Sequence, residues 1–146
     1  MKIYYEDSMP YAAEFFSGLG SSEAFSHKTI TPELIANADV LLTRSTTKVT
    51  PRLLQKAKKL QFVGTATAGT DHVDQAYLKQ QNIPFVSAGG CNAVAVAEYV
   101  LSTLFIMQKR LGWQLSEKTV GIVGAGHVGT ALAKHLTALG IHYKLC

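Results

Sequence analysis

The segment with the most specific chemistry is the glycine-rich turn Gly124–Gly129, which follows the β-rich run Thr119–Val123 and opens a helical pattern. In that setting the G-x-G-x-x-G spacing is typical of dinucleotide binding. Gly124 permits a tight turn, Gly126 lets the backbone approach a pyrophosphate, and Gly129 lets the helix pack closely on the strand. N–H groups at the helix N-terminus would then face the anion. The alternative is a glycine-rich turn with no ligand, but the strand and the helix around it favour dinucleotide binding.

The same fingerprint requires an Asp or Glu about 20 residues further on, where it binds the ribose hydroxyls. Glu117 is the last acidic residue of the chain, and the strand that should carry the acid has only begun when the sequence reaches Cys146. We therefore expect this chain to be a fragment of a longer protein.

Two polar segments follow other predicted strands, and ligands bind at the carboxyl ends of parallel strands. Thr43–Lys48 presents two cations and a run of hydroxyls, which suit a phosphate or a carboxylate. A solvated loop with a helix-capping Thr is the alternative. Thr65–Asp74 is a turn of small residues whose N–H groups could receive an anion. Its alternative is that Asp71 and Asp74 only cap the next helix.

Other kinds of site have little support. The five histidines show no metal-ligand spacing, and His72 between Asp71 and Asp74 is a weak candidate for a metal site. Ser45 has no His near it in the sequence, so no nucleophile–base pair is visible. We predict no metal site and no catalytic residue in this chain.

Composition excludes several classes of partner. The chain has 146 residues, is 47% hydrophobic, and carries 14 basic and 10 acidic residues, which indicates a globular protein of net charge +4. Three of the four excess charges lie in the last fifth of the chain, and the tightest basic cluster lies near the end of a predicted helix, where cations offset the helix dipole. We therefore expect no nucleic-acid partner. The basic residues of the last fifth are Lys118, Lys134 and Lys144, and the tight cluster is Lys56, Lys58 and Lys59.

The sequence also argues against a membrane or secreted protein. Ala93–Met107, the longest apolar stretch, is too short to span a bilayer and contains Glu98. Cys91 and Cys146 lie far apart, and the chain opens without a signal-peptide pattern. We expect a reduced, cytoplasmic protein.

Strand-like runs alternate with helical patterns, which predicts an α/β fold with a parallel sheet. We predict five strands before residue 90, in a small flavodoxin-like domain. Those that can be located are Lys2–Tyr5, Val40–Thr43, Gln61–Gly64 and Pro84–Ser87. The predicted helices are Pro10 to about Gly18, one starting at Thr31-Pro32-Glu33, one from Thr50-Pro51 to near Lys59, and Asp74–Gln81.

Gly89–Asn92 is the clearest break, and Asn92 is a natural N-cap for a helix from Ala93 to about Lys109. That helix is apolar nearly all round, so we expect it to be covered on several sides and to cross into a second domain. The pattern continues with a loop Gly112–Lys118, a strand Thr119–Val123, a helix His127–Leu139 stopped by Gly140, and a strand from Ile141. We predict residues 1–91 as one domain and 92–146 as the crossover helix and the start of an incomplete Rossmann domain.

These motifs together resemble the erythronate-4-phosphate dehydrogenase branch of the D-2-hydroxyacid dehydrogenase family. The glycine fingerprint and the Asn-Ala…Ala-Glu helix are general to the family, whereas the Arg-Ser-x-Thr-Lys-Val and Thr-Ala-Thr-Ala-Gly-Thr-Asp-His-Val-Asp segments are typical of this branch. The resemblance covers the whole chain and rests on Glu6–Ala12, Arg44–Val49, Phe62–Asp74, Cys91–Val100 and Thr119–Gly129.

The resemblance implies a substrate domain, formed by residues 1–91 with a returning C-terminal segment, and an NAD domain inserted between the two. Ser45 and Thr67 match the family's substrate-binding positions, and His127 and Val128 match its pyrophosphate-contacting turn. The family usually has Asn or Arg where His127 stands, but a neutral His can still donate to a phosphate.

The implied reaction is NAD-dependent oxidation of 4-phosphoerythronate, a small phosphorylated 2-hydroxyacid, in pyridoxal-phosphate biosynthesis, by a homodimer. The family's catalytic Arg, acid and His come from its second half, so the resemblance implies that this chain alone is inactive. Two alternatives stay open. One is another D-2-hydroxyacid dehydrogenase, such as a phosphoglycerate dehydrogenase. The other is a non-catalytic anion- or nucleotide-binding module, which could also associate through the Ala93–Met107 helix.

Overall fold

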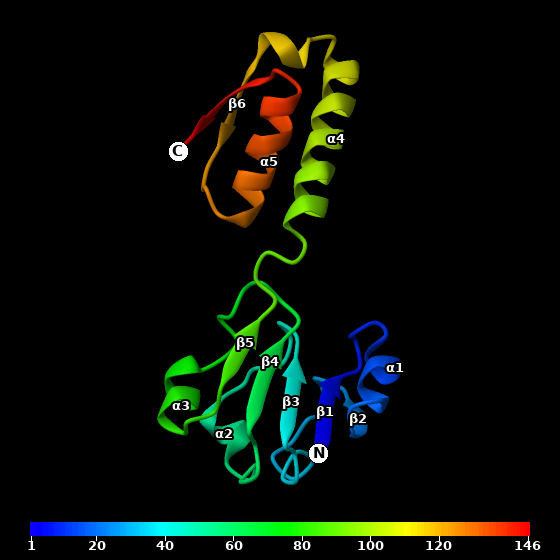
Figure 1. Ribbon diagram of the computed structural model, residues 1–146, viewed down its shortest axis with the longest axis vertical. Helices are drawn as coiled ribbons and strands as arrows, with labels where there is room; N and C mark the ends of the chain where they lie inside the picture. The colour runs from blue at the N-terminus through cyan, green and yellow to red at the C-terminus, as the bar shows by residue number, and fades with distance from the viewer. The chain divides into compact units, whose positions relative to one another are not determined.

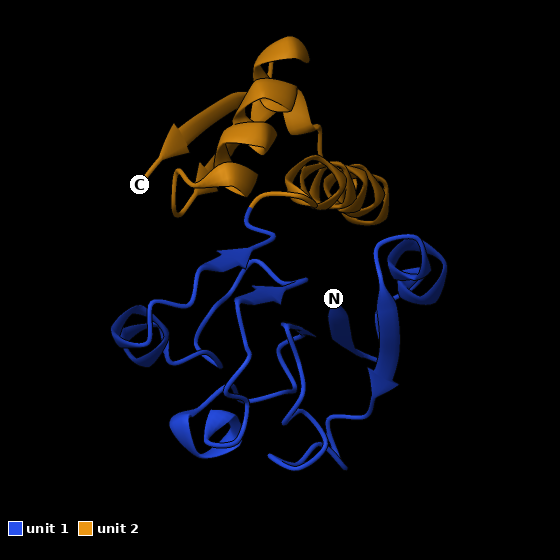
Figure 2. Cartoon of the chain, turned by 60° about the horizontal axis from the view of Figure 1, so that its bottom comes forward, with its two compact units in different colours: residues 1–89 blue, residues 90–146 orange.

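The computed structural model describes residues 1–146, which form two compact units, Met1–Gly89 and Gly90–Cys146 (Figures 1 and 2). The strands are β1 (Lys2–Glu6), β2 (Ser21–Phe25), β3 (Val40–Thr43), β4 (Phe62–Thr65), β5 (Phe85–Ser87), β6 (Thr119–Ile122) and β7 (His142–Leu145). The helices are α1 (Ala12–Ser17), α2 (Pro51–Leu54), α3 (Gln75–Gln80), α4 (Ala93–Leu111) and α5 (His127–Ala138), with a 3-10 helix at Leu115–Glu117.

The first unit is a five-stranded parallel sheet in the order β2-β1-β3-β4-β5. This is the flavodoxin-like order, so the predicted fold class is confirmed. β2 is the strand that the sequence did not locate. It lies at the edge of the sheet, and only Phe25 among its five residues is buried, so it lacks the apolar pattern that marks the other strands.

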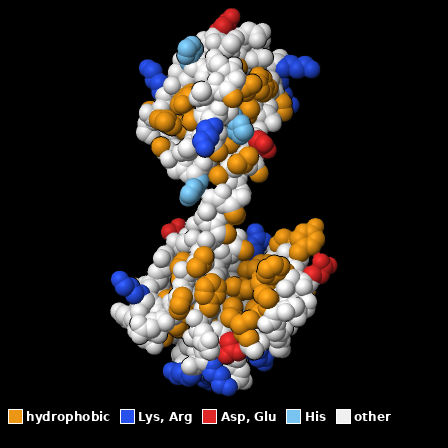
Figure 3. Space-filling view, in the orientation of Figure 1, with side chains coloured by type: hydrophobic (Ala, Val, Ile, Leu, Met, Phe, Trp, Pro, Cys, Tyr) orange, Lys and Arg blue, Asp and Glu red, His pale blue; other side chains and the backbone are white.

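The order of the strands creates a switch point in this sheet. The chain leaves β1 through α1 to reach β2 on one side, and returns across β1 to reach β3 on the other. Right-handed crossovers in opposite directions place their connections on opposite faces, so a crevice opens between the carboxyl ends of β1 and β3. One core, which includes Ile35, Leu41, Val63 and Leu78, joins the sheet to α2 and α3. Figure 3 shows hydrophobic side chains gathered on the visible face of this unit.

The helix predicted from Thr31 is wrong. Thr31 Oγ1 does accept a capping bond from Leu34 N at 3.3 Å, but the segment then closes as turns, with Ala36 N and Ala38 N bonding three residues back. Asp39 ends it, because its carboxylate accepts the Lys2 N–H at 2.6 Å and so fixes where the chain enters β3.

The helix predicted from Thr50 is much shorter than expected. Thr50 caps it and Pro51 begins it as predicted, but α2 ends at Leu54, and short-range bonds then turn Ala57 and Leu60 into the core. The lysine cluster therefore follows α2 instead of sitting in its last turn, so the predicted dipole role is wrong. Lys56 pairs with Glu33 at 2.7 Å instead.

The second unit contains α4, α5 and the parallel pair β6 and β7 around a core of its own. Gly140, at φ 66°, ends α5 as predicted, and the Ile141 N–H closes the helix onto Leu136 O at 2.9 Å. Asn92 stands at the N-cap position of α4 as predicted, although its side chain makes no capping bond. α4 leaves exposed side chains, such as Tyr99 at 73%, so this unit alone does not supply the predicted cover on several sides. No helix is both long and apolar enough to cross a membrane.

Candidate functional site

The crevice between β1 and β3 is organised by one buried carboxylate. Glu6 ends β1 and is fully buried, and its oxygens accept four hydrogen bonds. Arg44 N donates to Oε2 at 2.9 Å and the Thr47 hydroxyl at 2.6 Å, while the Thr46 and Ser8 hydroxyls donate to Oε1. Three of the four donors belong to the loop after β3, so Glu6 fixes that loop.

These bonds decide the charge of Glu6. Burial alone would raise the pKa of its carboxyl group, since a charge loses hydration inside a protein. Hydrogen bonds from Thr46, Thr47, the Arg44 N–H and Ser8 favour the ionised form and together hold the pKa of Glu6 below its ordinary value. Glu6 is therefore a buried anion whose charge is already satisfied by donors of the chain.

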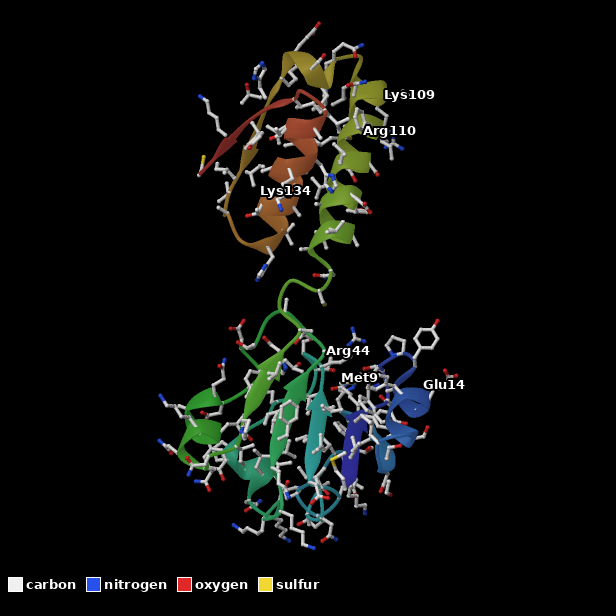
Figure 4. All side chains as sticks on the ribbon, viewed as in Figure 1. Met9, Glu14, Arg44, Lys109, Arg110 and Lys134 are labelled. Atoms are coloured by element: carbon white, nitrogen blue, oxygen red, sulfur yellow. The ribbon has the colours of Figure 1, made fainter.

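Arg44 keeps its own charge available. Its Nη1 donates to Ser8 O at 3.1 Å, and the ion pairs of the chain, Lys2–Glu23 and Lys56–Glu33, do not include it. Figure 4 shows Arg44 beside Met9 at the strand ends, and both line a cavity of about 530 Å³. The other lining residues are Pro10, Tyr11, Ala12, Phe15, Phe16 and Ala66. A cation at the edge of an apolar hollow can bind an anionic group strongly.

The predicted substrate residues lie on neighbouring loops. Ser45 is exposed and follows β3, and Thr67 is half-buried and follows β4, which pairs with β3. The structure therefore brings both to the carboxyl edge of the sheet. Thr67 donates to Gly69 O at 2.9 Å, and its oxygen lies 2.8 Å from that of Thr65.

The Asp residues of this segment have a structural role at one position. Asp74 accepts the Tyr77 N–H at 2.9 Å and caps α3, as the alternative interpretation held. His72 does not take part in a metal cluster, since no group of three or more metal-ligating side chains is present. Its Nε2 instead lies 3.0 Å from the Thr65 hydroxyl.

The second unit builds the glycine turn with tight packing at one position and open space at another. Gly124 has φ 96°, a conformation that disfavours any side chain. A Cβ at Gly129 would lie 2.0 Å from Gly124 O, so the helix can approach the strand only because Gly129 has none. At Gly126 a Cβ would meet nothing within 4 Å, which leaves room beside the backbone for a ligand.

The start of α5 faces that space with free donors. No side chain caps the helix, so the N–H groups of His127, Val128 and Gly129 have no acceptor from a capping residue. The His127 ring packs on Gly90, where a Cβ would lie 2.8 Å from Cγ. A cavity of about 520 Å³ opens beside Gly126 and His127 and also borders Lys134, which projects from α5 (Figure 4). This arrangement can receive an anion such as a pyrophosphate.

Sequence reasoning missed Glu6, Thr65 and the role of His72. The sequence shows only a charged residue directly after the apolar run Ile3-Tyr4-Tyr5, which does not reveal the role of Glu6. No local signal marks the contact between Thr65 and His72, because it depends on how the loop after β4 folds back.

Comparison with known proteins agrees with this geometry. Residues 4–131 match the family model of the D-isomer specific 2-hydroxyacid dehydrogenase catalytic domain. The erythronate-4-phosphate dehydrogenase of Pseudoalteromonas atlantica is 66% identical over the whole chain, and the match covers 39% of that protein. The chain thus spans about two fifths of the length of the curated relative that it matches.

Solved structures share the fold. D-lactate dehydrogenase from Aquifex aeolicus, in complex with NAD and lactic acid, superposes with a TM-score of 0.81 at 18% identity, over 99% of this chain and 50% of that one. NAD+-bound 3-phosphoglycerate dehydrogenase of Entamoeba histolytica gives 0.77 at 25% identity, over 100% of this chain and 53% of that one. With a family model matched across most of its length, the chain belongs to the D-isomer specific 2-hydroxyacid dehydrogenase family.

Proposed function

We propose that the complete enzyme oxidises the C2 hydroxyl of 4-phosphoerythronate to the 2-oxo acid, 2-oxo-3-hydroxy-4-phosphobutanoate, with NAD as the cofactor, and that this chain alone is inactive. The observation that carries the proposal is the glycine turn of the second unit, where Gly129 packs on Gly124 O and Gly126 faces open space. The substrate is supported by the name of the relative that is 66% identical over the whole chain. Pyridoxal-phosphate biosynthesis is the pathway that we propose for this reaction.

The glycine turn fits the cofactor. Gly124, Gly126, His127, Val128 and Gly129 would hold the pyrophosphate, with the open space at Gly126 for its approach and the uncapped N–H groups of α5 as donors. When bound, NAD accepts the hydride that leaves C2 of the substrate. The helix dipole adds favourable charge at the same place.

The switch point of the first unit fits an anionic substrate. Arg44 has no carboxylate partner, so its guanidinium can pair with a phosphate or carboxylate oxygen. Ser45 is next to it in the chain, Thr67 lies on the neighbouring loop after β4, and both carry hydroxyl groups. The buried Glu6 repels anions but has its charge met by four donors, and Arg44 is the one charged residue among those that line the cavity beside Met9.

We assign residues 1–91 to the substrate domain and residues 92–146 to the crossover helix and the beginning of the NAD domain. We also propose a cytoplasmic homodimer. The exposed apolar side chains of α4, Tyr99, Ile106 and Leu111 among them, support a protein partner on that helix. Two exposed, unpaired cysteines suit a reducing compartment. Light scattering that finds only monomers across a wide concentration range would contradict the dimer for this chain.

Two titrations of the chain test the proposal, followed by nuclear magnetic resonance of its backbone amides. NAD should shift the amides of Gly124–Gly129, and Gly126→Val should abolish these shifts because its side chain fills the open space. 4-Phosphoerythronate should shift Arg44, Ser45 and Thr67, more strongly than 3-phosphoglycerate does, and Arg44→Met should weaken the response. Shifts at these sites that are equal for 3-phosphoglycerate and 4-phosphoerythronate would refute the substrate, and NAD shifts outside the turn would refute the cofactor site.

A further inference from the structure

Thr67 belongs to a chain of polar groups that runs across the loop after β4. His72 Nε2 lies 3.0 Å from Thr65 Oγ1, Thr65 Oγ1 lies 2.8 Å from Thr67 Oγ1, and Thr67 Oγ1 lies 2.9 Å from Gly69 O. Each hydroxyl has one proton to donate, and a carbonyl oxygen only accepts. The protons can therefore be assigned by counting.

The count begins at the carbonyl end. Gly69 O can only accept, so the Thr67 proton points to it. The contact between the two hydroxyls must then be bridged by the proton of Thr65, which makes Thr67 its acceptor. Thr65 Oγ1 also lies 3.2 Å from Thr43 O, which can accept a second bond, but a proton directed there would leave the 2.8 Å contact between the two hydroxyls without one.

With its proton used, Thr65 can only accept from His72. We propose that His72 is a positioning residue, donating from Nε2–H to Thr65 and thereby fixing the direction of the hydroxyl of Thr67. The backbone holds His72 in place for this role, since its carbonyl accepts the Val49 N–H at 2.8 Å and Val73 beside it is buried. Three donors aligned in one direction also strengthen one another.

The direction of the chain determines what Thr67 recognises. Its proton is committed to Gly69 O and one lone pair to Thr65, so the atom offers a ligand its second lone pair. An acceptor suits a hydroxyl group and not an anionic oxygen. Resting on the proposed function, this assigns the anionic groups of the substrate to Arg44 and its hydroxyl groups to Thr67.

The first experiment concerns the chain without ligand. Long-range proton–nitrogen correlation spectra distinguish the two neutral tautomers of imidazole, and neutral His72 should show the proton on Nε2. A proton on Nδ1 would overturn the proposal, because Nε2 would then accept from Thr65. This measurement does not depend on any substrate, so it decides the proton chain even if the proposed function is wrong.

The second experiment separates the role of His72 from simple packing. Gln at position 72 can place an N–H donor near the position of Nε2, whereas Leu fills similar space without one. We expect 4-phosphoerythronate to bind the wild type and His72→Gln alike, and His72→Leu about three- to tenfold more weakly. Equal affinities for His72→Leu and the wild type would overturn the proposal.

Deoxy analogues test which group Thr67 binds. Removing the 2- or the 3-hydroxyl of 4-phosphoerythronate should weaken binding to the wild type, and for one of the two the loss should vanish in Thr67→Val. If both losses persist in Thr67→Val, hydroxyl recognition by Thr67 is wrong. If the wild type binds none of these compounds, the proposed substrate and hydroxyl recognition fall together, while the tautomer of His72 still decides the proton chain.

Discussion

Replacing Glu6 with Ala should destabilise the first unit selectively. The side chain joins β1 to the loop after β3 across 38 to 41 residues of sequence, and no other acidic side chain reaches those donors. Ala leaves the N–H of Arg44 and the hydroxyl of Thr47 without their acceptor, and Thr47 is only 2% exposed. The loop that carries Ser45 should then lose its fixed conformation.

The loss of stability depends on which of the four donors can form a hydrogen bond to water once the carboxylate is removed. Ser8 and Thr46 are exposed, so their hydroxyls exchange the carboxylate for solvent at little cost. The other two bonds, to a charged acceptor, contribute about 1.5–3 kcal/mol each. Part of this is offset because the mutant no longer buries a carboxylate. We expect a net loss of about 2–4 kcal/mol in the free energy of unfolding.

The chain offers an internal control for the assay. Trp113 is its single tryptophan and lies in the second unit, so its fluorescence reports that unit alone, whereas far-ultraviolet circular dichroism reports both. In urea, Glu6→Ala should lower the midpoint of the dichroism transition and leave that of Trp113 unchanged. Glu23→Ala is the matched variant, since it removes a carboxylate of an exposed pair with Lys2 at 3.9 Å, which should cost less than about 0.5 kcal/mol.

Two results would refute this reasoning. If Glu6→Ala costs no more than Glu23→Ala, the four bonds to Glu6 do not organise the loop. If the Trp113 transition moves as far as the dichroism transition, the loss is not confined to the first unit.

Three further predictions concern pH, the glycine turn and a helix cap. The pKa of Glu6 is lowered from 4.5, so its ionised form should stabilise the first unit above that pH. This stabilisation should be lost as the pH falls through the lowered value. Acid titrations of Glu6→Gln, followed by circular dichroism, should lack this component. Gly129→Ala should destabilise the second unit, because its Cβ would lie 2.0 Å from Gly124 O. Gly126→Ala should leave the stability reported by Trp113 within about 0.5 kcal/mol of the wild type, because a Cβ there meets nothing within 4 Å. The same variant should weaken NAD binding in calorimetry. Asp74→Ala should cost about 1 kcal/mol in urea unfolding, and Asp71→Ala, which removes no bond to α3, should cost less.

The parts of the fold that the sequence predicted well depend on local chemistry. The glycine turn, the cap of α3 by Asp74 and the stop of α5 at Gly140 each lie within a few residues of the element that they shape. The strands of the sheet interior were located because both of their faces are covered, which gives a continuous apolar run. Edge strand β2 has no such run, and its place was found only by its pairing with β1.

The wrong predictions arise where distant contacts override local signals. Thr31-Pro32 and Thr50-Pro51 are both good helix starts, and both caps form. The first segment nevertheless forms turns and no helix, and the second helix is cut short. The Lys2 N–H bonded to Asp39 fixes the first segment, and burial of Ala57 and Leu60 turns the second into the core. A start signal therefore predicts where a helix begins better than how far it runs.

The candidate site shows the same division between local and distant information. Arg44, Ser45 and Thr67 could be proposed from residue type and from their place after predicted strands. Glu6 could not, because a carboxylate near a proposed anion site opposes binding unless its charge is already satisfied, and three of the donors that satisfy it lie 38 to 41 residues away. The switch point supplies the reason that these groups meet, since the order of the strands places the ends of β1 and β3 side by side. Candidate ligand-binding residues can thus be proposed from local pattern, whereas the residues that hold them in place follow from topology.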